Sequence, residues 1–370
     1  MKILFDSYHL YHFPQFEPVV KLLSAQSDIQ LYFSHASGIP AAEKEILSTV
    51  FQRFPGEVIT ADSEEQRADR IRRLEPDVFL CGWSRYPLNE FVPPRTWVGM
   101  IYHGIGVKPS YWRDHNHRLD VRFVEGPLRL RQLQQRRLPG ELILTGYAKL
   151  DPLFNGSLDE PFHPSLREST AKPLLLYAPT FYPSSLEKFG MKLGDLTQDY
   201  QVILKLHMWT YFLDEWSGIS LKRQRRLAEK LARKFNHITL LGPEVYNIVP
   251  YYALADILLT EASSTIYEMM ALNKPVVVAD FYRLRLSHQL FRKRIYQRRL
   301  DREMSQEMTD FCFHLAEPQQ LPAVLQEAFT ANDRYDDLRK QYQQDMLYRL
   351  DGRASHRIVQ AIQRHFHPES

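Results

Sequence analysis

Two histidines stand directly after apolar runs of this chain, where a parallel sheet would present them to a ligand. His103 follows the run 97–102 and precedes Gly104, so backbone can approach a ligand closely beside it. Histidine is the commonest general base near neutral pH. The position predicts either a catalytic base or a loop histidine with a structural hydrogen bond.

His207 shares the end of the apolar run 201–206 with Lys205. The two-residue period of a strand would direct both side chains to the same face. Such a cationic pair suits the phosphate of a substrate. The alternative is a surface lysine beside a buried, hydrogen-bonded histidine.

A run of small hydroxyl residues joins another apolar segment to a predicted helix at 266–272. Ser263, Ser264 and Thr265 lie where hydroxyls satisfy the first N–H groups of a helix. These N–H groups and the helix dipole also bind phosphate, and Glu268, one turn later, could reach a ribose hydroxyl. The segment predicts a nucleotide diphosphate site, or a capping motif without a ligand.

A fourth polar group follows the apolar run 174–177, where Pro179 fixes the backbone and Thr180 presents a hydroxyl. This is either a ligand contact or a plain turn. His115 and His117 form an H-x-H pair, which we expect to be solvated or hydrogen-bonded, so no metal site is predicted. The chain has no GxxxxGK[ST], no GxGxxG after its first strand, no GxSxG and no HExxH motif.

The elements that must hold these residues alternate between short apolar runs and amphipathic stretches, which is typical of an α/β fold with a parallel sheet. The polar segment 155–173 interrupts the alternation and predicts a linker. We therefore expect two Rossmann-like domains facing a cleft, at residues 1–160 and 174–350, and a helix within 351–370. Strands are predicted at 2–5, 29–33, 77–81, 97–102, 141–145, 174–177, 201–206, 238–241, 256–260 and 275–279, and helices at 18–24, 64–74, 266–272 and over most of 321–365.

The composition is that of an ordinary globular protein. The 370 residues include 47 Lys+Arg and 44 Asp+Glu, a formal net charge of +3, and 44% are hydrophobic. Cys81 and Cys312 are too few for a disulfide framework or a cysteine-based zinc finger. No run approaches the ~18 apolar residues of a membrane span, and the first residues lack a signal-peptide pattern, so we expect a cytoplasmic protein.

Positive charge is nevertheless concentrated in places. Residues 281–300 contain many arginines and no acid, with apolar residues at helical spacing, and 118–137 is a second basic region. The first segment predicts contact with an anionic membrane surface, a nucleotide or a polyanionic acceptor. The alternative is an interdomain helix whose arginines pair with acids. No RNA-binding module accompanies the charge, so we expect no nucleic-acid partner.

Seven short motifs follow one another between residues 100 and 357. They are His103-Gly104, Thr145-Gly146 with Asp151, Tyr177 to Thr180, Lys205 with His207, Thr260 to Ser264, Lys274-Pro275 and Asp351 to Ser355. In this order the chain resembles the CDP-glycerol glycerophosphotransferase family of teichoic-acid and capsule polymerases.

The resemblance implies a GT-B fold, in which two Rossmann-like domains face a cleft and the C-terminal helix crosses back to the first domain. It implies transfer of a polyol phosphate, in the first instance glycerol phosphate, from a CDP donor to an acceptor hydroxyl, with release of CMP. His103 would be the base, and His207 would stabilise charge on the diphosphate. The remaining implied donor-binding residues are Gly104, Thr180, Lys205, Glu261, Ser263, Ser264, Thr265 and Glu268.

No cofactor is implied beyond the donor, CDP-glycerol or a related CDP-polyol, and the need for a divalent metal stays open. The implied acceptor is a cell-surface glycan or a lipid-linked precursor, reached from the cytoplasm at the inner face of the membrane. Three other functions fit the residues: a GT-B glycosyltransferase using a nucleotide sugar, a nucleotide-sugar 2-epimerase and a non-catalytic binding protein. For the epimerase, the sequence does not identify the carboxylates that proton abstraction needs.

Overall fold

The computed structural model describes residues 1–83, 87–106, 116–159, 172–291 and 308–367. The chain forms two compact units. Unit 1 comprises Met1–Ile105, Ser110–Leu158 and Gln344–Ser370, and unit 2 comprises Gly106–Pro109 and Asp159–Gln343. The last helix of the chain therefore belongs to unit 1, which also contains the first strand.

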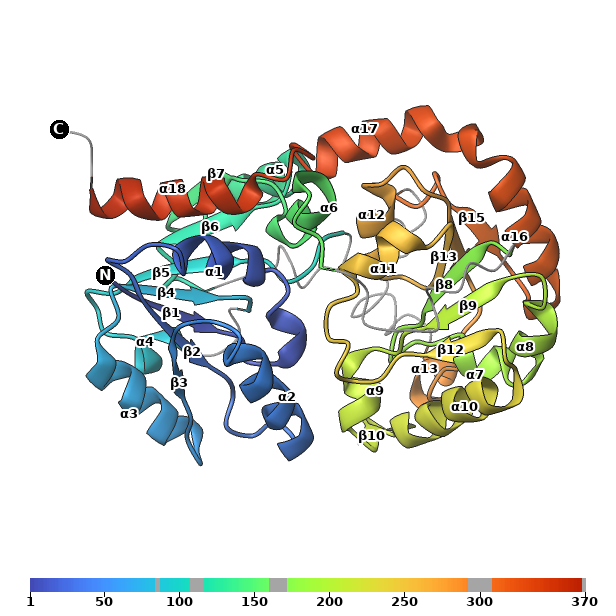
Figure 1. The fold of residues 1–370 in the computed structure, drawn as a ribbon, viewed down its shortest axis with the longest axis horizontal. Coiled ribbons are helices and arrows are strands. Elements are labelled where there is room, and N and C mark those ends of the chain that lie inside the picture. The colour runs from blue at the N-terminus through green and yellow to red at the C-terminus, as the bar shows by residue number, and fades with distance from the viewer. Residues whose placement is uncertain (84–86, 107–115, 160–171, 292–307, 368–370) are drawn as a thin grey trace. The chain divides into compact units, whose positions relative to one another are not determined.

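Unit 1 is built on a parallel sheet of seven strands in the order β3-β2-β1-β4-β5-β6-β7 (Figure 1). The inner strands β4 and β5 are buried at every residue, as parallel strands generally are. The strands are β1 (Lys2–Asp6), β2 (Gln30–Ser34), β3 (Glu57–Ile59), β4 (Val78–Cys81), β5 (Trp97–Ile101), β6 (Val121–Val124) and β7 (Glu141–Leu144).

The helices of unit 1 carry clear start signals. At the start of α3 (Glu64–Leu74), the Ser63 hydroxyl accepts the N–H of Gln66 at 3.2 Å. The last helix, α18 (Ala354–Phe366), packs on α1 (Glu17–Leu23) although almost the whole chain separates them. The other helices are η1 (Leu10–His12), α2 (Ala41–Phe51), α4 (Leu88–Phe91), α5 (Pro127–Arg136), η3 (Ala148–Leu150) and α6 (Asp151–Asn155).

Unit 2 repeats this plan with a six-stranded parallel sheet in the order β12-β9-β8-β13-β14-β15. A small antiparallel pair, β10 (Glu215–Trp216) and β11 (Ile219–Ser220), stands apart from it. The sheet strands are β8 (Leu174–Ala178), β9 (Gln201–Leu204), β12 (Ile238–Leu240), β13 (Ile257–Thr260), β14 (Val276–Ala279) and β15 (Phe313–Leu315).

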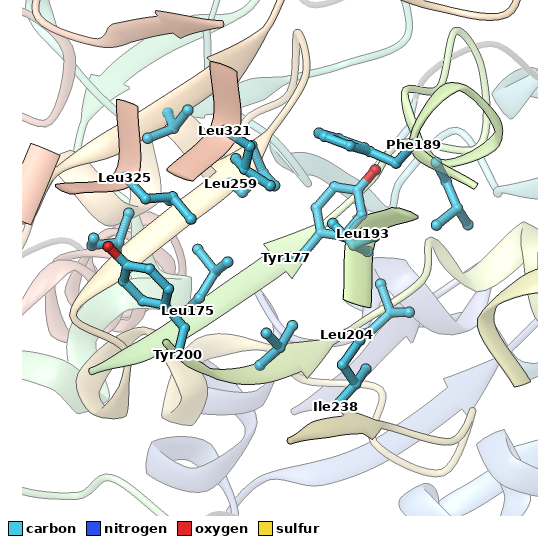
Figure 2. Packing of buried hydrophobic residues seen from close by; sticks show 14 of the residues in the cluster. Leu175, Tyr177, Phe189, Leu193, Tyr200, Leu204, Ile238, Leu259, Leu321 and Leu325 are labelled. Atoms are coloured by element: carbon cyan, nitrogen blue, oxygen red, sulfur yellow. The ribbon is translucent and has the colours of Figure 1, made fainter. Parts of the chain in front are cut away.

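One face of this sheet packs against helices in a continuous apolar cluster (Figure 2). Tyr177 of β8 lies beside Phe189, while Leu321 and Leu325 of α16 cover Leu259 of β13. Burying side chains of this size stabilises a fold by about 1.5–3 kcal/mol each. The helices of unit 2 are α7 (Leu186–Phe189), α8 (Lys192–Leu196), α9 (Met208–Phe212), α10 (Leu221–Lys234), α11 (Val249–Leu254), α12 (Thr265–Met270), α13 (Leu286–Leu290), η5 (Pro318–Gln320), α16 (Leu321–Thr330), η6 (Asn332–Tyr335) and most of α17 (Asp336–Met346).

Every strand predicted from the sequence is present, and the prediction of an α/β fold with parallel sheets is confirmed. The strand predicted at 201–206 is shorter in the structure, where β9 ends at Leu204. The alternation of side chains between the two faces of a strand therefore does not extend to Lys205 and His207. The sequence analysis missed three strands of the two parallel sheets, β3, β6 and β15, each of only three or four residues, and also the two-residue strands β10 and β11. Within the described residues, no helix is long and apolar enough to cross a membrane.

Candidate functional site

The order of strands marks the same place in each unit. In each parallel sheet, the first strands are added toward one edge and the later strands toward the other edge. This change in strand order falls between β1 and β4 in unit 1, and between β8 and β13 in unit 2. Ligands of such sheets bind beyond the carboxyl ends of the strands at this point. The candidate residues of each unit are described below relative to this edge.

His103 lies just beyond β5, and its ring nitrogen Nδ1 is 2.7 Å from the carbonyl oxygen of Gly82. A carbonyl only accepts hydrogen bonds, so Nδ1 carries the proton and donates it. In the neutral ring, Nε2 is then the basic nitrogen. This tautomer makes Nε2 the nitrogen that could accept a proton, and Gly104, which follows, is buried.

His12 packs against His103, with ring centroids 4.5 Å apart and planes inclined by 37°. It is fully buried. Burial first, and then the nearby His103 and His9, hold the pKa of His12 well below the ordinary value of histidine, although the Ser7 backbone acts in the opposite direction. His12 is therefore a neutral ring at physiological pH, and it forms an uncharged wall beside His103.

His207 stands at the N-cap of α9, where its Nδ1 accepts the backbone N–H of Trp209 at 3.2 Å. A nitrogen that accepts a hydrogen bond carries no proton, so the neutral ring of His207 holds its proton on Nε2. The ring lies 4.7 Å from that of Phe181 and is only partly buried. His207 thus offers an N–H donor at the carboxyl end of β9.

Lys205 does not share the surroundings of His207, contrary to the sequence prediction of a pair on one face. It is buried, and its Nζ contacts the carbonyl of Leu206 at 3.3 Å and lies 4.6 Å from the Tyr211 ring centre. Burial lowers the pKa of Lys205 to about 7, which the Glu244 charge partly offsets. The sequence alternative of a surface lysine beside a buried histidine is also wrong, because the lysine is the more buried of the two.

Glu261 connects the two strand ends at the switch point of unit 2. It is completely buried, and its carboxylate accepts the N–H of Thr180 at 2.6 Å and the N–H of Ser185 at 2.8 Å. The Ser185 hydroxyl donates to it as well. Burial raises the pKa of Glu261 to about 7 despite these donors. The carboxylate therefore holds the loop after β8 from behind, rather than lying on the surface of that loop.

The hydroxyl run leads into α12 as expected. Ser263, Ser264 and Thr265 are partly buried, and the Ser263 hydroxyl accepts the N–H of Thr265 at 3.4 Å. The Thr265 hydroxyl contacts that of Thr260 at 3.1 Å. Glu268 points into unit 2, where it accepts the Tyr252 hydroxyl at 2.7 Å and is fully buried. The serines lie at the sheet edge, whereas Glu268 lies behind it.

Two of the sequence motifs meet each other in unit 1. The Asp151 carboxylate accepts the backbone N–H groups of Ala354 at 3.0 Å and of Ser355 at 2.7 Å, at the start of α18. Gly352 has a positive φ, and a side chain there would collide with Asn155. These motifs dock the last helix on unit 1.

The Lys274-Pro275 motif has a structural explanation too. The Lys274 ammonium donates to the carbonyls of Tyr252, Ala253 and Ala255 at 3.0, 2.7 and 2.8 Å. These carbonyls close the C-terminal end of α11, where a cation is favourable. This motif therefore supports the unit from behind the sheet edge.

Part of the basic segment lies outside the described residues, from 292 to 300, as does His115. Within the described part, Arg283 pairs with Glu187 at 2.7 Å and Arg285 contacts His288 at 2.7 Å. His117 is exposed. Among the residues that the structure describes, no group of three or more His, Cys, Asp or Glu side chains could hold a metal ion.

Sequence reasoning missed the surroundings of His103. Gly82, His12 and Gln15 follow β4 and β1, so the rule that singled out His103 applied to them equally. The signal was the polar and aromatic segment 7–16 directly after the first predicted strand.

The fold of the chain is shared with several solved structures. A putative UDP-N-acetylglucosamine 2-epimerase from Listeria monocytogenes matches with a TM-score of 0.67 and 14% identity, over 100% of this chain and 97% of that one. The wall teichoic acid polymerase TagF matches with a TM-score of 0.66 and 14% identity, over 98% and 88%. The UDP-GlcNAc 2-epimerase from Neisseria meningitidis, bound to UDP-GlcNAc, gives 0.63 and 16%, over 98% and 99%. At these identities the likeness shows the fold, which is that of GT-B enzymes.

A comparison with curated proteins finds no match. The family model for CDP-Glycerol:Poly(glycerophosphate) glycerophosphotransferase matches residues 136–364, from the last residue of α5 to a point within α18. The match includes every described strand of unit 2 and the motifs that dock the last helix. Because it spans well over half of the residues, the chain belongs to the CDP-glycerol:poly(glycerophosphate) glycerophosphotransferase family of transferases.

Proposed function

We propose that this transferase moves glycerol phosphate, or a related polyol phosphate, from a CDP-activated donor to a hydroxyl of a cell-surface glycan or lipid-linked precursor. The other product is CMP. The family supports the reaction class. The observation that carries the assignment of a base is the hydrogen bond from His103 Nδ1 to the Gly82 carbonyl, which leaves Nε2 basic.

In the proposed step, the acceptor hydroxyl attacks the phosphorus atom that carries the glycerol. A new O–P bond forms, and the bond from this phosphorus to the bridging oxygen breaks, so CMP leaves with the electron pair. The proton of the hydroxyl passes to Nε2 of His103. Phosphoryl transfer of this kind needs mainly positioning and charge stabilisation, with little covalent chemistry from the protein.

Unit 2 is proposed to hold the donor. The Nε2–H of His207 would donate to diphosphate oxygens, on which negative charge develops. Ser263 and Ser264 would bind the phosphate from the start of α12, with Thr265 beside them. Thr180 is buried and its hydroxyl donates to the Pro183 carbonyl, so it would shape the loop after β8 instead. Lys205, Glu261 and Glu268 are buried, so in this proposal they act through the loops that they support.

The test measures CMP release from CDP-glycerol and from CDP-ribitol, with a glycerol-phosphate oligomer on a lipid carrier as the acceptor. UDP-N-acetylglucosamine serves as the comparison donor, with 2-epimerisation followed in the same samples. Release of CMP with extension of the acceptor is the expected result. A folded protein that releases CMP from neither CDP-polyol would contradict the proposal, and turnover of the UDP-sugar would favour the alternatives.

We also propose that the protein works at an anionic membrane surface. Leu290 and Phe291, at the end of α13, are 77% and 55% exposed, and the sequence of this region carries basic residues without acids. Flotation with vesicles of anionic lipid at low salt should carry the protein upward, whereas neutral vesicles should not. The L290S/F291S variant should float less, and a wild-type protein that stays in the soluble fraction would refute membrane binding.

A further inference from the structure

Gly82 has two contacts that bear on His103. Its carbonyl oxygen, just beyond the end of β4, accepts the Nδ1–H of His103 at 2.7 Å. Because this hydrogen bond selects the tautomer, the position of one backbone carbonyl decides which nitrogen of His103 is basic. Orienting groups of this kind commonly fix the ring of a functional histidine.

The second contact is on the Cα of Gly82, which has no room for a side chain. A Cβ built there would lie 2.6 Å from Nε2 of Gln15, and 3.4 Å from Cβ of His12. The first distance is shorter than real Cβ contacts allow, and the second is an ordinary van der Waals contact. The backbone of Gly82 is outside the left-handed region, so alanine is compatible with its conformation. Alanine at this position therefore requires a shift, either of the end of the Gln15 side chain or of the Gly82 backbone.

Gln15 and His12 are both fully buried. The side-chain amide of Gln15 makes no hydrogen bond within the described residues, so packing alone holds it against Gly82. A methyl group at position 82 would thus push on a tightly enclosed amide. The backbone that carries the carbonyl would have to move, or the amide would have to be displaced.

We propose that Gly82 is a positioning residue, which fixes the tautomer of His103 through its carbonyl, and that the buried Gln15 side chain packed on its Cα opposes a larger residue there. The inference rests on the proposed role of His103 as the base. It adds that Gly82 orients the ring of His103 and that Gln15 limits substitution at Gly82.

The variants are G82A, G82A/Q15A and, as the matched control, G38A. Gly38 is in the same unit, and a Cβ there would meet nothing within 4 Å. We expect G82A to lower kcat by about ten-fold or more, with the KM for CDP-glycerol within about two-fold, because a displaced base affects the transition state rather than donor binding. G82A/Q15A, which removes the colliding amide, should recover to within about three-fold of wild type, and G38A should match wild type.

Nitrogen-15 NMR of labelled imidazoles, with His103 assigned by its loss in H103A, reads the tautomer without any turnover. Wild type should show the proton on Nδ1, G82A should lose this state, and the double variant should regain it. A wild-type His103 protonated on Nε2 overturns the inference, and so does a G82A protein with the wild-type tautomer and kcat. If wild type releases no CMP while the tautomer responds as described, the proposed function fails and the positioning role of Gly82 stands.

Discussion

The two units present a histidine at the same edge of similar sheets, in opposite tautomers. In unit 1, Nδ1 of His103 donates to a backbone carbonyl, so Nε2 is basic. In unit 2, Nδ1 of His207 accepts a backbone N–H at the start of a helix, so Nε2 carries the proton. The backbone group beside each ring thus favours a basic Nε2 on His103 and an Nε2–H donor on His207.

The comparison shows how a repeated fold can hold two chemical roles. In the loop after β4, a peptide oxygen faces Nδ1 of His103. At the start of α9, a peptide N–H faces Nδ1 of His207. The neighbouring rings do not make the difference, because each histidine lies against an uncharged ring, His103 against His12 and His207 against Phe181.

Removing the base should have the largest effect. H103A should lower kcat by ~10² or more, the usual contribution of a positioned base, with little change in the KM for CDP-glycerol. The measurement is steady-state CMP release. The exposed His117 supplies the control, since H117A should keep wild-type activity. Wild-type turnover by a folded H103A protein would remove His103 from the base role.

Removing the donor should have a smaller effect. Asparagine is a good N-cap, so H207N should keep the start of α9 while losing the Nε2–H, and kcat should fall by about 10- to 100-fold. H207A should lose the same activity and also about 1 kcal/mol of stability. Kinetics and thermal unfolding of the two variants separate the roles. Equal activity of H207N and wild type would leave only the capping role.

Glu261 should make the stability of unit 2 depend on pH. Its pKa is raised to about 7 in the folded protein, whereas an unfolded glutamate has an ordinary pKa near 4.5. Between these values the folded state holds a proton that the unfolded state has lost. The free energy of unfolding should therefore fall as pH rises, by up to about 1.4 kcal/mol per pH unit, and level off above pH 7.

This slope is measured by unfolding the protein with denaturant at several pH values between 5 and 8. Hydrogen exchange monitors the unfolding of unit 2. E261Q has no carboxyl to titrate there and should lose the slope. E229Q, on the exposed side of α10, should keep it. An unchanged slope in E261Q would assign the titration to another group.

The smallest effect concerns the helix that completes unit 1. D151A removes the carboxylate that caps α18 and should cost about 1–2 kcal/mol. Hydrogen exchange of residues 354–366 should accelerate, while the core strands of unit 2 stay protected. D345N, which breaks an exposed pair with Arg131, should change nothing measurable. Protection of α18 equal to wild type in D151A would show that packing on α1 alone holds the helix.

The sequence predicted most strands because each contains a run of apolar residues, and β4, β5, β13 and β14 are buried throughout. It did not predict β6, because Arg122 interrupts the run. That arginine is fully buried, with its guanidinium donating to the carbonyls of Pro139 at 2.7 Å and Asn116 at 2.9 Å. A charge that finds such acceptors is invisible to a hydrophobic pattern. In β15, the exposed His314 divides a three-residue strand in the same way.

The candidate site was predictable in its positions but less so in its roles. The strand-end rule found His103, His207 and the serines of α12, because parallel strands place their carboxyl ends at one edge. It could not separate residues at this edge from those behind it. Glu261 and Glu268 are buried within unit 2, where Glu261 binds the distant loop after β8 and Glu268 binds Tyr252 of α11.

The docking of α18 has a consequence for how the protein is made. Ser355 follows its capping partner Asp151 by 204 positions, and the strands of unit 2 are synthesised between them. Until α18 leaves the ribosome, the apolar side of α1 lacks the helix that packs on it. Unit 2 can fold at a stage when unit 1 still lacks α18. A nascent chain should therefore expose the apolar side of α1, which chaperones can bind until α18 has been synthesised.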